Sequence, residues 1–89
     1  MRILRYVKPV KIYTTQYCPY CVRAKRLLQK KNVTYQEIDV SEDDDARMRM
    51  MQVTGRQTVP QIFIGDRHVG GSDDLHALEA RGELDSLLQ

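Results

Sequence analysis

The chain has 89 residues, 42% hydrophobic and 29% charged, an ordinary composition for one compact soluble domain. Its net charge of +2 is too balanced for a nucleic-acid-binding protein, which would carry a strongly basic surface. No apolar run could span a bilayer, and the first nine residues lack the apolar stretch of about 7–15 residues that a secretory signal needs. We therefore expect a cytoplasmic protein without nucleic-acid or membrane partners.

The first half of the chain predicts a strand, a helix and a second strand. Residues 10–14 alternate and are rich in β-formers, which predicts a strand. A polar loop leads to Cys18, and Pro19 suits the first turn of a helix that ends near residues 31–32. Residues 33–40 alternate again and predict the second strand. A strand–helix–strand crossover of this kind is almost always right-handed.

The middle of the chain predicts a helix and a hairpin. Ser41 is a suitable N-cap for a helix that runs through residues 46–53 and ends at Gly55. Residues 60–64 and 67–69 flank a Gly-Asp pair, which predicts an antiparallel hairpin.

The last segment completes the fold prediction. Ser72 is a suitable cap for a further helix that Gly82 ends, and residues 83–88 predict a short helical tail. Because the hairpin is antiparallel and the first crossover is parallel, we expect an α/β fold with a small, four-stranded mixed sheet and helices on both faces.

The two cysteines of the chain are the first candidates for chemistry. Cys18 and Cys21 flank a Pro-Tyr pair between a strand and a helix start, a context typical of a redox-active pair. Unpaired N–H groups at a helix N-terminus stabilise a thiolate, so Cys18 is the candidate nucleophile. Cys21, one turn further in, can close a disulfide with it, and this exchange needs neither metal nor bound cofactor. So few cysteines also favour a reducing compartment.

Three other interpretations explain the cysteines less well. A structural disulfide between them would close too small a loop to stabilise the fold much. A zinc site would need two more ligands, for which only His68 and His76 are available. An inert buried pair is disfavoured by the polar and basic surroundings.

Two further segments are candidates for binding. Pro60 opens a strand, where an ordinary trans peptide is the expectation from the residues themselves. Gly70 and Gly71 precede Ser72, and this pattern fits either a turn before a capped helix or an anion site at a helix N-terminus. The residues leave both interpretations open.

The remaining candidates have structural explanations. His68 on an edge strand and His76 on a helix face are expected at the surface rather than in catalysis. Tyr20, inside the cysteine motif, is expected to be exposed beside the thiol. The methionines of the second helix are expected to pack against the core: Met48, Met50 and Met51.

Three motifs together resemble the dithiol glutaredoxins. These are Cys18-Pro-Tyr-Cys21, Thr58-Val-Pro60 and Gly70-Gly-Ser-Asp-Asp-Leu75, in the order and spacing of that family. The resemblance covers residues 10–88, is strongest to the bacterial glutaredoxin 3-like group, and implies a thioredoxin-like fold. Residues 1–9 would then be a short N-terminal extension to a glutaredoxin domain of residues 10–89.

The resemblance implies a glutathione-dependent thiol–disulfide oxidoreductase that works as a monomer. Cys18 would attack a glutathionylated protein or a protein disulfide, and Cys21 would resolve the mixed disulfide. Glutathione would regenerate the dithiol as a co-substrate, with no cofactor and no metal bound. Ribonucleotide reductase is a family-level expectation for the protein partner.

The resemblance also implies a binding site for glutathione. Val59 and Pro60 would form a cis peptide facing the thiols, and the Val59 backbone would pair with glutathione like an added strand. Thr58 would line the groove and Tyr20 would form one wall. The γ-glutamyl end would be held by Gly71, Ser72 and Asp73.

Two positions depart from the family pattern. Thr15 stands where a Lys is common, three residues before the first cysteine, and Gln57 stands where an Arg often precedes Thr-Val-Pro. In the family both cations help to bind the glycine carboxylate of glutathione and keep the thiolate charged. The candidates to replace them are Lys11, Arg47 and Arg56.

Three other functions compete with this one. A glutaredoxin-like protein reduced by thioredoxin reductase would have a different segment at residues 70–74. The second is an iron–sulfur carrier, in which a cluster bridges two chains through Cys18 and two glutathiones. Monothiol relatives carry such a cluster, but Pro19 and Cys21 make this function less favoured here. In a plain interaction domain the cysteines would be incidental.

Overall fold

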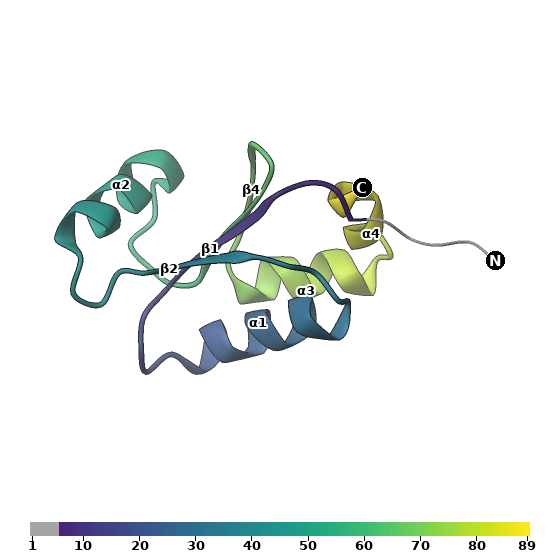
Figure 1. The fold of residues 1–89 in the computed structure, drawn as a ribbon, viewed down its shortest axis with the longest axis horizontal. Coiled ribbons are helices and arrows are strands. Elements are labelled where there is room, and N and C mark those ends of the chain that lie inside the picture. The colour runs from purple at the N-terminus through teal and green to yellow at the C-terminus, as the bar shows by residue number, and fades with distance from the viewer. Residues whose placement is uncertain (1–5) are drawn as a thin grey trace.

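The computed structural model describes residues 6–89, which fold into a four-stranded sheet and four helices (Figure 1). The strand order is β2-β1-β3-β4, with β1 parallel to β2 and antiparallel to β3, and with β3 antiparallel to β4. The predicted four-stranded mixed sheet is therefore confirmed. The elements are β1 (Val10–Thr14), α1 (Pro19–Lys30), β2 (Gln36–Asp39), α2 (Asp44–Thr54), β3 (Gln61–Ile64), β4 (Arg67–Gly70), α3 (Ser72–Ala80) and α4 (Leu84–Leu88).

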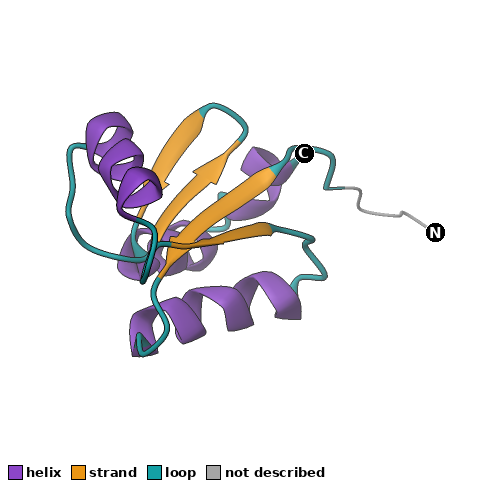
Figure 2. Ribbon diagram, turned by 60° about the vertical axis from the view of Figure 1, so that its left-hand side comes forward, coloured by secondary structure: helices purple, strands orange, loops and turns teal. Residues whose placement is uncertain are grey.

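Helices cover both faces of the sheet, as predicted (Figure 2). Side chains of a strand alternate between the two faces, so Ile12 and Ile62 pack with α1, α3 and α4, whereas Tyr13 packs with Met50 of α2. The larger core contains fully buried leucines, each of which stabilises the fold by about 1.5–3 kcal/mol. These are Leu28, Leu75, Leu84 and Leu88. The sheet is thus held between two apolar layers that fix the strand ends.

The second strand begins at Gln36 rather than at residue 33, and Val33 takes part in the end of α1 instead. Asn32 adopts a left-handed conformation with φ 59°, and its N–H donates to the Gln29 carbonyl at 3.0 Å. The N–H of Val33 donates to the Leu28 carbonyl at 2.9 Å, and its side chain is buried in the core. This is a Schellman motif, and it uses the backbone of Val33 that a longer β2 would have needed.

The predicted N-cap of α2 is wrong. Asp43 caps the helix, with its Oδ1 accepting the N–H of Ala46 at 3.0 Å. The hydroxyl of Ser41 instead accepts the N–H of Gln16 at 2.9 Å, across to the loop that precedes Cys18. Tertiary contact has therefore redirected a good capping side chain. The helix ends at Gly55, in the left-handed region with φ 69°, as predicted.

Other sequence predictions have mixed outcomes. The hairpin, the end of α3 before Gly82 and the short final helix are confirmed. Met50 is fully buried, but Met48 is 59% exposed, because it lies on the solvent side of α2. The predicted extension of residues 1–9 lies partly outside the described residues. Across residues 6–89 none of the helices has the length and apolar character needed to cross a membrane.

Candidate active site

Cys18 is the N-cap residue of α1, as the sequence predicts. Its backbone is extended, with φ −128° and ψ 102°, and Pro19 occupies the first helical position. The Cys18 Sγ accepts the backbone N–H of Cys21 at 3.1 Å. The sulfur thus takes the place of the oxygen in an ordinary Ser or Asp cap, next to the positive end of the helix dipole. This position stabilises negative charge on the sulfur.

Cys21 lies one turn further along α1 and is the less exposed of the pair, at 1% against 8% for Cys18. Both are free thiols. Burial, together with the contact to Cys18, raises the pKa of Cys21 to about 12. Cys21 is therefore a neutral thiol near pH 7. The two cysteines differ in burial and in their position relative to the helix N-terminus, which suits a nucleophile and a resolving thiol.

The segment before β3 faces the cysteines. The Val59–Pro60 peptide is cis, in agreement with the resemblance and against the expectation for an isolated proline. The Cys18 Sγ lies 3.8 Å from the Val59 carbonyl oxygen, to which the S–H donates. This contact joins residues 41 positions apart in the sequence. The strand-to-helix loop and the Val-Pro segment therefore form one site.

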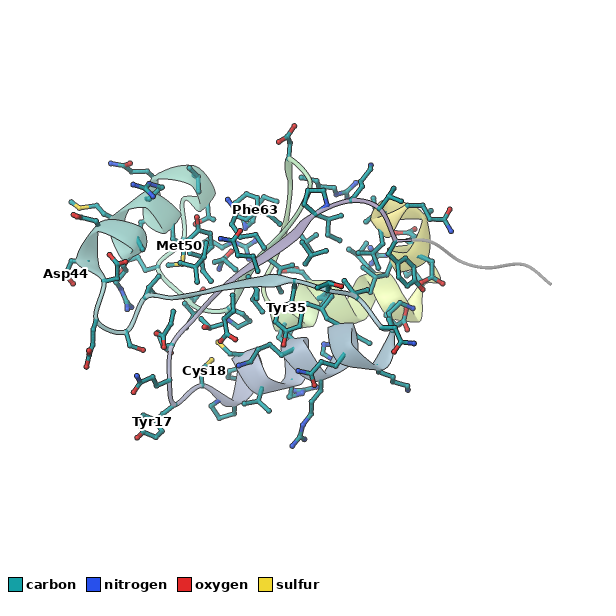
Figure 3. The ribbon with its side chains drawn as sticks, viewed as in Figure 1. Tyr17, Cys18, Tyr35, Asp44, Met50 and Phe63 are labelled. Atoms are coloured by element: carbon teal, nitrogen blue, oxygen red, sulfur yellow. The ribbon has the colours of Figure 1, made fainter. Side chains whose placement is uncertain are left out.

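A groove of about 530 Å³ lies beside this site. Residues 56–60 form one wall and residues 71–74 the other, while Thr15, Tyr20 and Arg47 complete the lining. The groove brings together all the residues that the resemblance assigns to glutathione, namely Tyr20, Thr58, Val59, Pro60, Gly71, Ser72 and Asp73. Tyr20 is 56% exposed, so it presents a largely accessible ring at the edge of the groove. In Figure 3, Cys18 lies at the start of α1, next to the loop tip that carries Tyr17.

The second helix that starts at the groove is α3, and its predicted cap is wrong. Gly71 is the N-cap residue, and Ser72 is the first residue of the helix. The side chain of Asp74 reaches back, and its Oδ2 accepts the Gly71 N–H at 2.9 Å. This N–H, and then the Arg56 guanidinium at 3.2 Å, hold the pKa of Asp74 below its usual range. Glycine is required at Gly70, where φ is 119° and the Asp74 carboxylate occupies the space of a Cβ.

Asp74 is the site residue that sequence reasoning missed. The pattern that could have identified it is a carboxylate three residues after a helix cap, from which a side chain can reach back to the N–H of the cap. The sequence analysis instead placed the cap one residue late, at Ser72, which hides this spacing.

The groove also contains the two positions that depart from the family pattern, Thr15 and Gln57. Of the three cations considered as replacements, Arg47 and Arg56 line the groove. The ammonium of Lys11 lies instead over two aromatic rings, 6.0 Å from the centre of Tyr13 and 5.9 Å from that of Phe63. Lys11 is therefore excluded as a replacement, because it belongs to the sheet face under α2.

Comparison with known proteins identifies the family of the chain. The family model described as glutaredoxin matches residues 10–69. The chain is 58% identical to a glutaredoxin of Pseudomonas aeruginosa, covering 90% of this chain and 95% of that one. It is 54% identical to glutaredoxin 3 of Escherichia coli, covering 90% and 96%.

Among solved structures, a buckwheat glutaredoxin–glutathione complex aligns with a TM-score of 0.84 at 33% identity, over 96% of this chain and 80% of that one. The family match, the two close relatives and the shared fold agree with one another. The chain therefore belongs to the glutaredoxin family of thiol–disulfide oxidoreductases, with the thioredoxin-like α/β fold.

Proposed function

We propose that the protein reduces glutathione mixed disulfides and protein disulfides, with glutathione as the reductant. The observation that carries this proposal is the position of Cys18. Its sulfur caps a helix at 3.1 Å from the N–H of Cys21 and lies 3.8 Å from the Val59 carbonyl at the edge of the groove. A nucleophile is thus placed where the sulfur of a groove-bound tripeptide can reach it.

The first reaction needs Cys18 only. The Cys18 thiolate attacks the glutathione sulfur of a glutathionylated protein, so that the old S–S bond breaks and a Cys18–glutathione S–S bond forms. The protein leaves as a thiolate and takes up a proton. A second glutathione, as its thiolate, then attacks the glutathione sulfur bound to Cys18. Glutathione disulfide leaves, and the Cys18 thiolate is restored.

The second reaction uses both cysteines. Cys18 attacks a protein disulfide and forms a mixed disulfide with one protein sulfur. Cys21 loses its proton, attacks the Cys18 sulfur and releases the protein as a dithiol, which leaves a Cys18–Cys21 disulfide. Two glutathiones reduce this disulfide and leave as glutathione disulfide. The burial that raises the pKa of Cys21 keeps it out of the first step.

The groove supplies the binding of glutathione in this proposal. The Val59 backbone pairs with the cysteinyl residue of glutathione as an added strand would. The γ-glutamyl carboxylate lies at the start of α3, whose first N–H groups have no partner within the helix, with its ammonium near Asp73. Arg47 and Arg56 line the same groove and supply positive charge for the glycine carboxylate. Tyr20 and Thr58 complete the walls.

A coupled assay tests the proposal. Glutathione, glutathione reductase and NADPH should support reduction of a small glutathione mixed disulfide by the purified protein. Turnover that depends on thioredoxin reductase instead would contradict it. We further propose that the protein is a monomer that works in the cytoplasm, because a chain with only two cysteines is typical of a reducing compartment. Gel filtration of the reduced protein, with and without glutathione, checks the monomer.

A further inference from the structure

A buried amide side chain lies between the groove and the sheet. Gln61 follows Pro60 directly, begins β3 and has none of its surface exposed. A buried glutamine has two N–H donors and a carbonyl acceptor that need partners, because leaving them unpaired is unfavourable. The hydrogen-bond partners of Gln61 therefore show which parts of the structure this side chain connects.

Both ends of the Gln61 amide have partners. Its Nε2 lies 3.0 Å from the Thr58 carbonyl oxygen and 3.3 Å from the Thr58 hydroxyl. Its Oε1 lies 2.7 Å from Nε2 of His68 on β4. The amide thus connects one wall of the groove to the edge strand of the sheet. Among residues 6–89 every buried side-chain nitrogen and oxygen has a partner, so the connection is complete.

The chemistry of these groups fixes the direction of each hydrogen bond. The Thr58 carbonyl can only accept, so the Gln61 nitrogen faces it and the Gln61 oxygen faces His68. That oxygen also only accepts, so Nε2 of His68 carries a hydrogen and donates. The hydrogen bond survives whether His68 is neutral or charged, because Nδ1 is then the atom that titrates.

His68 is held by its surroundings as well. Its ring lies 5.0 Å from that of Phe63, at an interplanar angle of 32°, and Phe63 packs against the core cluster that contains Met50 of α2. Burial, and then the charge of Arg56, lower the pKa of His68, while Asp74 opposes the shift. Arg56 and Asp74 are the charged groups that face it, and both line the groove. A packed imidazole, neutral near pH 7, is therefore linked through Gln61 to the wall of the groove that contains Thr58.

We propose that Gln61 and His68 are positioning residues that hold Thr58 and Val59 in the conformation that receives glutathione. The inference rests on the function proposed above. Both donors of the Gln61 amide are committed to Thr58, so the orientation of that residue depends on them. The next residue, Val59, presents its carbonyl to Cys18 and its backbone to the tripeptide. Loss of the amide–imidazole pair should therefore misplace the substrate rather than the nucleophile.

The central test replaces His68 while keeping its ring. His68→Phe preserves packing on Phe63 but leaves the Gln61 oxygen without a donor. We expect KM for a glutathionylated peptide to rise about tenfold with kcat little changed, because a raised KM at unchanged kcat reports lost substrate binding rather than lost chemistry. The thiolate absorbance of Cys18 should titrate as in the wild type. His68→Gln, which restores a donor, should bring KM back towards the wild-type value.

Two further variants separate positioning from stability. Arg67→Gln, exposed on the same strand, is the matched control and should change nothing. The double variant Gln61→Met with His68→Phe removes the buried amide as well, so it leaves no buried amide oxygen without a hydrogen-bond partner. Its Tm should therefore recover relative to His68→Phe alone, while KM stays high.

Three results would count against these ideas in different ways. If KM follows Tm across the variants, the residues are merely structural and the positioning role is wrong. An unchanged KM in His68→Phe, with an active wild type, overturns it too. A wild type that is inactive with glutathione overturns the proposed function instead.

Discussion

Two helices begin at the same groove, and their first turns use the same backbone groups in opposite ways. At the start of α1 the cap residue Cys18 points its sulfur forward, onto the N–H of Cys21. At the start of α3 the cap residue Gly71 has no side chain, and Asp74 reaches back to the N–H of the cap. Both starts have N–H donors without a partner in the helical backbone ladder, and both lie at the positive end of a helix dipole.

The difference lies in what occupies the donors. At the start of α1 the N–H of Cys21 donates to the Cys18 sulfur, a position suited to a nucleophile. At the start of α3 the carboxylate of Asp74 accepts the N–H of Gly71, and Gly71, Ser72 and Asp73 line the groove. In the function proposed above, this start holds the γ-glutamyl carboxylate of glutathione. Under that proposal, one helix start serves the chemistry and the other serves binding.

The largest effect should come from removing the sulfur of Cys18 at the start of α1. Cys18→Ser should lower both proposed reactions by at least about 10³-fold, because the reacting atom itself is lost. Serine is a good helix cap, so the fold should be retained. The coupled glutathione assay and circular dichroism together check this. Substantial residual activity would mean that Cys18 is not the nucleophile.

The next effect separates the two cysteines of α1. Cys21→Ser should keep the reduction of glutathione mixed disulfides and lose the reduction of protein disulfides, since only the second reaction needs a resolving thiol. Both reactions are to be measured on the same preparation. An equal loss of both would contradict the division of roles between Cys18 and Cys21.

A smaller effect is expected at the start of α3. Gly70→Ala places a methyl group where the Asp74 carboxylate lies, at φ 119°, and should lower the free energy of unfolding by about 1–3 kcal/mol and raise KM for glutathione. Gly55→Ala is the matched control, since it also has positive φ but has open space around it. Urea unfolding should show a loss in both variants, larger at Gly70, while KM should rise at Gly70 alone. A rise of KM in both variants would mean that the effect does not come from the groove.

The smallest effect concerns the charge of Asp74. The pKa of this carboxyl is lowered in the folded protein, by the Gly71 N–H first and by Arg56 second. Its stabilisation is therefore present above the unfolded pKa, about 3.9, and is lost as the pH falls through the lower folded value. Asp74→Asn should destabilise the protein at neutral pH and leave it less sensitive to acid. Unfolding curves at several pH values measure this, and parallel pH dependence in both proteins would refute it.

Much of the fold follows from local rules. The alternation of residues 10–14, the proline after Cys18 and the glycines after α2 and α3 predict those elements, because each rule acts within a few residues. The local rules fail where a distant residue competes. The hydroxyl of Ser41 accepts the N–H of Gln16 instead of capping α2. Val33 ends α1 and packs into the core instead of extending β2.

The sequence alone determines that a cysteine stands at a helix start, since the strand, the loop and Pro19 that put it there are neighbours along the chain. Tertiary structure decides the rest of the site. Contact across 41 residues brings Val59 to the Cys18 sulfur, and burial separates the pKa of Cys21 from that of an ordinary thiol. Folding also places Arg56 in the groove and Lys11 outside it. The pKa and the burial of a side chain depend on its neighbours in space, which a local sequence pattern does not predict.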